Sequence, residues 1–299
     1  MTAVPESFRR YGEESLPQAP AFGPGKDGVL EATLAREPGG ETRLISDLVK
    51  VPYHLTGTLD NDPAPGMTTL CVQEPTGGVA QGDRHVLDID AGERARGHVT
   101  TQSATKVHSM RANYAHLDAT FRAGPDAHLE YVPGPTILNE QSRCLNTVSV
   151  ELDPTASVIV ADVLVPDGLT GQAPFGFDHY HSRLNARCEG RLCCADTVDL
   201  RPAERDPRDS ATVGEYGVVG SLYVLSPSTD VESLSESIHD RLAERTASQA
   251  GVSTLPYGTG VTVRVLGDRS ADVIETVTAA FDETRRGLLG VGAPADRRY

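Results

Sequence analysis

Two histidines separated by one residue are the first candidates for metal chemistry in this chain. In an extended segment, His179 and His181 would place both rings on one side, which is ligand spacing for a transition metal. A metal-dependent hydrolase would also need a carboxylate, but no third ligand lies near the pair in the sequence and no H-E-x-x-H motif occurs. The sequence therefore favours a structural or surface role, with a hydrolase using His179, His181 and a carboxylate as the alternative.

Three carboxylates lie in or beside otherwise apolar strand segments: Asp83, Glu130 and Asp162. A carboxylate in such a place is costly unless it is paired or hydrated. The three are therefore either members of salt bridges or the lining of a polar passage, where oxygen ligands would let a divalent cation move on more readily than thiolates. For Asp83 we expect a structural role, because a Gly-Asp-Arg turn uses its Asp side chain to bind local backbone N–H groups.

Nucleophilic catalysis has no support in the sequence. No G-x-S-x-G elbow occurs. The adjacent Cys193 and Cys194 fall inside a predicted strand, where cysteine is usually a small buried hydrophobe. The five cysteines form no C-x-x-C pair, which indicates free thiols in a reducing compartment. The chain is therefore not expected to be an enzyme.

The net charge of the chain limits the kinds of partner that it can bind. The 299 residues carry a net charge of −15, and Lys26, Lys50 and Lys106 are the only lysines. Such a surface argues against nucleic acid and anionic membranes as partners, since both need a basic face. It is typical of proteins from a halophile, where salt screens the repulsion between carboxylates. The sequence has no apolar run of membrane-span length and no secretory signal, so we expect a cytoplasmic protein.

The pattern of strands and turns predicts a mainly β fold of stacked, β-hairpin or β-helix-like sheets. Turns at Ala91-Gly92, at 123–125 and at Pro154-Thr155 lie about 30 residues apart, each flanked by alternating apolar residues. A hairpin is expected to turn at Glu189-Gly190. From Val218 onward strands alternate with two helices, which begin near Val231 and Ser270.

The expected organisation has four parts. Residues 1–26 form an N-terminal arm that is mobile or lies along another surface, and 27–212 form the stacked-sheet region. Residues 213–290 form a smaller C-terminal α+β region with the two helices, and 291–299 form a tail.

One stretch, 73–108, contains two dense motifs. The first is GGVAQGDR at 77–84, with Gly77, Gly78, Gly82, Asp83 and Arg84. The second is TTQSATKV at 100–107, with Thr100, Thr101, Gln102 and Lys106. Three glycines within six residues require sharp turns or close approach of another backbone. On residue types alone, the stretch is a glycine-rich turn between strands.

The two motifs together resemble the signature of the urease accessory protein UreD family, also called UreH. That family has a GGv-x-GGD-like turn followed by TTQ-x-atK, and this chain departs from it at Gln81. Similar segments continue along nearly the whole chain: HLEYVPGPTIL at 128–138, YGVVGSLYVLSP at 216–227 and VTVRVLGDRSADVIETV at 261–277. The family's G-R-x-x-x-G-E motif is not matched at 167–175, so its roles are not carried over.

The resemblance implies a helically stacked β fold with two C-terminal helices and no catalysis. It implies that the chain binds apo-urease and recruits a UreF-like accessory protein and, through it, a UreG-like GTPase. Nickel would be delivered to urease through an internal channel, with Ni²⁺ in transit and no cofactor permanently bound. Asp83, Glu130 and Asp162 would then be candidates for the nickel path, and the two motifs for docking. A β-solenoid adhesion or carbohydrate-binding module is a third class, disfavoured by the lack of a signal peptide.

Overall fold

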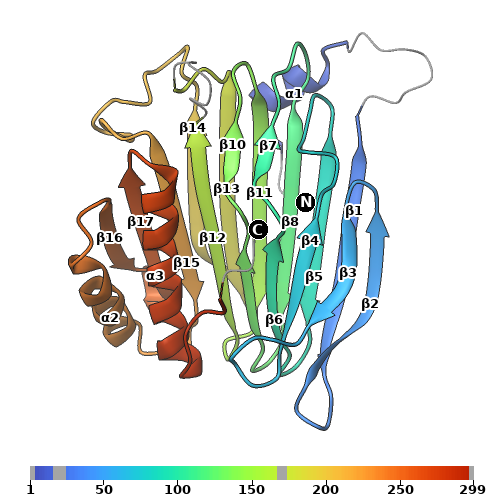
Figure 1. Ribbon diagram of the computed structural model, residues 1–299, viewed down its shortest axis with the longest axis vertical. Coiled ribbons are helices and arrows are strands. Elements are labelled where there is room, and N and C mark those ends of the chain that lie inside the picture. Colours follow the sequence, from blue (N-terminus) through green and yellow to red (C-terminus); the bar gives the residue numbers. More distant parts are fainter. Residues whose placement is uncertain (1–3, 16–24, 167–173, 296–299) are drawn as a thin grey trace.

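Two large β sheets face each other in the computed structural model, which describes residues 4–15, 25–166 and 174–295 (Figure 1). Within these residues, the seven-stranded sheet has the order β14 (Arg191–Leu200), β13 (His179–Cys188), β11 (Arg143–Leu152), β8 (Ala115–Ala123), β5 (Arg84–Ala91), β1 (Asp27–Arg36), β2 (Thr42–Lys50). The main path of the ten-stranded sheet is β16 (Gln249–Thr254), β17 (Gly260–Gly267), β15 (Val218–Leu225), β12 (Ser157–Pro166), β9 (His128–Val132), β6 (Arg96–Thr101), β4 (Met67–Gln73), β3 (His54–Leu59). The short strands β10 (Thr136–Leu138) and β7 (Thr105–Val107) complete it.

The chain alternates between the sheets and builds a β-solenoid. β5, β8, β11 and β13 pair in parallel in one sheet, and β4, β6, β9 and β12 do so in the other. The expected fold class, mainly β with stacked, β-helix-like sheets and two C-terminal helices, is confirmed. The turns after Ala91, Ala123 and Leu152 do not close hairpins, however. Each one carries the chain from one sheet to the other. The sequence shows that the chain turns at these points, but it does not show which strand the next segment will pair with.

Apolar residues that alternate along the strands fill the space between the sheets. Leu87 and Ile89 of β5 and Phe121 of β8 point inward, where they meet Leu129 of β9 and Val158 of β12. All five are at least 95% buried. The intervening residues of β5, such as Val86 and Asp88, point outward, as expected for strands with one solvated face.

The C-terminal part extends the ten-stranded sheet with antiparallel strands and covers its outer face with two helices. Helices α2 (Val231–Ala243) and α3 (Ser270–Leu289) lie against each other and against this sheet (Figure 1). Asp230 caps α2 by accepting a hydrogen bond from the Ser233 N–H. A 3₁₀ turn, η1 (Pro256–Gly258), links β16 to β17. Both helices expected from the sequence are confirmed, and so is the hairpin at Glu189-Gly190.

A short helix, α1 (Glu6–Gly12), forms in the N-terminal arm. Its Phe8 is fully buried and packs with Tyr114 and Leu145, so this part of the arm lies along the seven-stranded sheet. Residues 1–3 and 16–24 of the arm and 296–299 of the tail lie outside the described residues, and the four-part division stays a prediction. In the part of the chain that is described, no helix is both long and apolar enough to cross a membrane.

Candidate functional site

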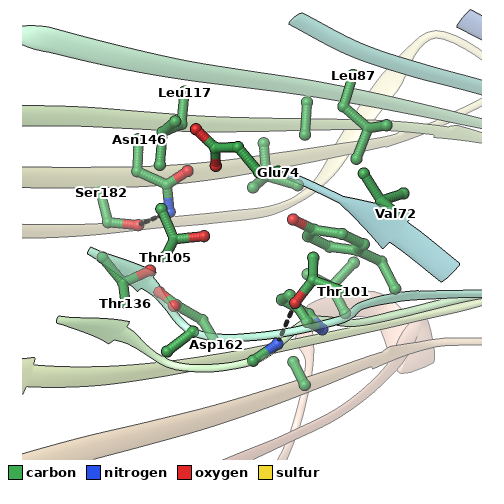
Figure 2. Close-up of a pocket in the computed structure, with 18 of the residues that line it drawn as sticks. Val72, Glu74, Leu87, Thr101, Thr105, Leu117, Thr136, Asn146, Asp162 and Ser182 are labelled. Atoms are coloured by element: carbon green, nitrogen blue, oxygen red, sulfur yellow. Dashed lines mark hydrogen bonds between the residues drawn. The ribbon is translucent and has the colours of Figure 1, made fainter. Parts of the chain in front are cut away.

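A cavity of about 310 Å³ with a mixed apolar and polar lining lies between the two sheets (Figure 2). Apolar side chains, among them Val72, Leu87 and Leu117, form part of its wall. Polar side chains from both sheets and their loops also line it, among them Glu74, Thr101, Thr105, Asn146, Asp162 and Ser182. A cavity with several oxygen atoms can hold water or a cation, whereas an apolar void of this size would stay dry.

Asp162 of β12 points into this cavity, although its neighbours Ala161 and Val163 are buried apolar residues on the other face of the strand. Its hydrogen-bond partner is the Tyr180 hydroxyl, which donates to Oδ2 over 3.4 Å. Burial raises the pKa of Asp162, and the more distant Arg264 only partly opposes this. The carboxylate therefore has spare oxygen lone pairs in a poorly solvated space, as a transient cation ligand would need.

Glu74 is a second cavity carboxylate, which the sequence analysis did not single out. It follows β4 directly, and burial raises its pKa against the opposing effect of Lys26. Its Oε1 has no hydrogen-bond partner and lies 3.6 Å from Nδ1 of the buried His85. Burial lowers the pKa of His85 to about 4, so the imidazole is neutral at pH 7. The sequence signal for Glu74 was its place just before the glycine turn.

The two signature motifs meet at one end of the cavity. Gly78 approaches β7 so closely that a Cβ atom would lie 2.3 Å from the Lys106 carbonyl oxygen. Its φ of +126° is also unfavourable for any other residue. The Val79 N–H donates to that same carbonyl over 2.8 Å. Gly77, Gly78, Thr101 and Lys106 all line the cavity, so the signature builds its rim.

The remaining signature residues fix the loops rather than line the cavity. Asp83 accepts hydrogen bonds from the Lys26 and Ala80 N–H groups, each over 2.8 Å, and its Oδ2 lies 3.1 Å from Lys26 Nζ. Arg84 donates to the carbonyls of Asp83 and Tyr114. Gly82, with φ of +82°, makes the turn before them.

Thr100 and Gln102 hold the second motif in place. The Thr100 hydroxyl donates to the Val132 carbonyl over 2.7 Å, and the Gln102 N–H donates to the Val72 carbonyl over 2.9 Å. Asp83, Thr100 and Gln102 are therefore bound to neighbouring backbone on both sides of the signature. The stretch at 167–173, where the family's Arg and Glu motif is not matched, lies outside the described residues.

Glu130 lies outside the cavity, in a fully buried ion cluster beneath α3. Its two oxygens are each 2.7 Å from a histidine nitrogen, Nδ1 of His98 and Nε2 of His128. Arg285 Nε lies 3.5 Å from Glu130, and the same guanidinium binds both oxygens of Asp62. Burial alone would raise the pKa of Glu130, but the hydrogen bonds from His128 and His98 hold it well below its ordinary value. Such saturation is typical of a structural ion cluster.

The structure supplies the third ligand that the sequence did not offer to His179 and His181. Antiparallel pairing of β13 with β14 places Asp199 directly opposite His181. One ligand atom from each of the three residues lies within 4.8 Å of the others. None of the three lines the cavity, so this cluster is separate from the carboxylates described above.

Comparison with known proteins assigns the chain to a family. The sequence profile described as "UreD urease accessory protein" matches residues 26–298. The urease accessory protein UreD of Natronomonas pharaonis is 70% identical over 299 residues, covering all of both chains. The UreD of Haloquadratum walsbyi is 56% identical over 295 residues, covering 99% of this chain and 97% of that one. That of Photorhabdus laumondii is 31% identical over 296 residues, covering 94% and 89%. The chain therefore belongs to the UreD urease accessory protein family.

Proposed function

We propose that this chain binds apo-urease in the cytoplasm and recruits a UreF-like accessory protein and, through it, a UreG-like GTPase for nickel delivery. Proteins of the UreD family are non-catalytic chaperones of urease maturation. The observation that carries the nickel part of the proposal is the cavity between the sheets, with Asp162 and Glu74 in its wall and the family signature at its rim.

The lining of the cavity suits a cation in transit rather than one held permanently. Carboxylate, hydroxyl and amide oxygens bind a borderline cation such as Ni²⁺ less firmly than thiolates do, and no cysteine is among the residues of the cavity wall. Of the three carboxylates that were candidates for a nickel path, Asp162 has the surroundings that support this role. Asp83 and Glu130 are already saturated with internal partners, which supports structural roles for them.

The hydrolase alternative loses its support. Family membership makes the chain a non-catalytic accessory protein. The rings of His179 and His181 lie under α1, where Phe8 packs 4.4 Å from the His179 ring centre. A substrate would need open space beside these ligands.

The proposal is tested by deleting the gene from its host and measuring nickel in purified urease. We expect urease to be made in normal amounts but to be nickel-poor and inactive. Restoring the wild-type gene should recover both nickel content and activity. Urease with a normal nickel content in the deletion strain, without added metal, would overturn the proposal.

A further inference from the structure

The cluster of His179, His181 and Asp199 lies on the outer face of the seven-stranded sheet. Tyr180 points inward to Asp162, so its neighbours His179 and His181 point to the opposite face. Asp199 reaches the same face from β14. Two imidazoles and one carboxylate, presented together by two paired strands, are a ligand set for a first-row transition metal.

The distances within the cluster fit a shared ion. Asp199 Oδ1 lies 2.7 Å from His179 Nε2 and 3.5 Å from His181 Nδ1. Ligands placed about 2.0–2.2 Å from one ion are separated by roughly 3–3.5 Å, so little movement is needed. His181 Nδ1 is buried and has no hydrogen-bond partner, although it faces this carboxylate. An unpaired buried nitrogen of this kind is costly and is satisfied by a metal ion.

The surroundings hold the carboxylate in a suitable orientation. Arg201 Nη2 donates to Asp199 Oδ2 over 3.0 Å, which leaves Oδ1 for an ion, as second-sphere groups do in metal sites. Arg201 Nε also lies 3.3 Å from His179 Nε2, and an ion on that nitrogen would displace this contact. Because one third of the Arg201 side chain is exposed, its Nε can move away from His179 while Nη2 keeps its bond to Asp199.

Helix α1 covers the cluster. Phe8 packs on the His179 ring with 4.4 Å between the ring centres, and Tyr11 meets the same ring edge-on at 5.8 Å. Glu14, just after the helix, binds Arg143 over 2.7 Å. An ion in the cluster would therefore reach solvent mainly past Asp199, whose side chain is 37% exposed.

We propose that His179, His181 and Asp199 bind one divalent first-row transition metal ion, of the Zn²⁺ or Ni²⁺ class, on the outer face of the solenoid, and that α1 slows its exchange. This site does not depend on the cavity or on the function proposed above. Its two parts, binding and cover, can be tested separately on the full-length protein.

The binding test titrates metal-free protein with Co²⁺, Zn²⁺ and Ni²⁺, using the visible Co²⁺ spectrum and metal analysis after equilibrium dialysis. We expect one ion whose affinity falls at least 10-fold in His181→Asn and in Asp199→Asn. Competition between Zn²⁺ and Ni²⁺ identifies the preferred ion. Two matched controls should retain it: His239→Ala, on α2, and Asp162→Asn, in the cavity.

Equal binding by the wild type and both site variants would overturn the proposal, as would loss of the ion in Asp162→Asn alone. Melting of the metal-free variants shows whether each one folds, and Asp199→Asn is the second variant should His181→Asn fail to do so. The cover test follows transfer of the bound ion to a chelator. We expect Phe8→Ala to speed this transfer several-fold, and an unchanged rate would refute the role of α1.

Discussion

Buried carboxylates in this protein fall into two kinds at the scale of single residues. Asp83 and Glu130 have their oxygens occupied by N–H groups and cations, and the chain folds around their negative charge. Asp162 and Glu74 face the cavity with oxygen atoms to spare, and burial raises the pKa of both. The first kind holds the fold together, whereas the second kind reduces stability when ionised and leaves oxygens for a ligand.

Asp162→Asn should therefore separate function from folding. A carboxyl group whose pKa is raised on folding destabilises the protein as pH rises through that pKa, so a neutral amide removes this cost. We expect an unchanged or slightly higher melting temperature and unchanged co-purification with urease and the UreF-like partner. Nickel transfer, measured as urease activation in the complemented deletion strain, should slow.

Two comparison variants sharpen this experiment. Glu151→Gln, on the solvated face of β11, should leave both activation and stability unchanged. Glu130→Gln should unfold more easily by about 3–5 kcal/mol, because it removes one member of a buried ion cluster. Loss of folding or of assembly in Asp162→Asn would refute its place on a nickel path.

His85 makes stability depend on pH. Its pKa is lowered to about 4 by burial, whereas an unfolded chain has an ordinary histidine pKa near 6.5. The unfolded state thus binds more protons between these values, and stability falls as pH drops from about 6.5 to 4. We expect His85→Gln to remove up to about 3 kcal/mol of this fall. Urea titrations at several pH values measure it, and parallel pH profiles for wild type and variant would contradict it.

At the scale of elements, the two signature motifs lie against each other, and each supplies part of the rim of the cavity. The glycine loop at 77–79 lies against β7, and a backbone bridge joins Val79 to Val107. The Lys26 ammonium donates to the Gly78 carbonyl over 2.9 Å, so the residue just before β1 also joins at this point. The rim of the cavity is therefore set by backbone approach, which explains why glycine is required at one particular position.

Gly78→Ala should be far more harmful than Gly77→Ala. Both residues have positive φ, so alanine is strained at either position. Only at Gly78 would the new Cβ collide with backbone, since nothing lies within 4 Å of a Cβ at Gly77. We expect a loss of about 1 kcal/mol for Gly77→Ala and at least about 3 kcal/mol for Gly78→Ala, measured by chemical denaturation. Equal losses would show that φ strain alone matters.

The sequence predicted where the strands and helices lie better than it predicted which of them pack or pair with one another. Period-2 apolar residues located many of the strands and helical spacing located both C-terminal helices, because these signals are local. A side-chain cap forms only at α2, where Asp230 accepts from the Ser233 N–H, and not at α3. The turn at Ala91-Gly92 could not reveal that it joins two sheets, since strand pairing is decided by packing across the core. For the same reason Asp199, 18 residues from His181, became a neighbour only through hairpin register. Arg285 was missed as the partner of Glu130 because helix α3 brings it from the far end of the chain.

At the scale of the whole molecule, charge sets the conditions for stability. The net charge is −15, and relatives at 45–70% identity come from haloarchaea. Self-repulsion of a compact acidic body is relieved when salt screens its surface. We expect the purified protein to melt at a clearly higher temperature in molar KCl than at low ionic strength, and to expand or aggregate in the latter. Scattering and thermal melts measure both, and equal melting temperatures would contradict this expectation.

The ion pair between Asp62 and Arg285 spans 223 residues, and both side chains are fully buried. During synthesis the ribosome makes Asp62 long before the arginine that pairs with it. Until Arg285 and the rest of α3 are made, the Asp62 carboxylate has no arginine to pair with, and burying it alone would be strongly unfavourable. The helical cover over this part of the ten-stranded sheet can therefore close only once α3 has been made.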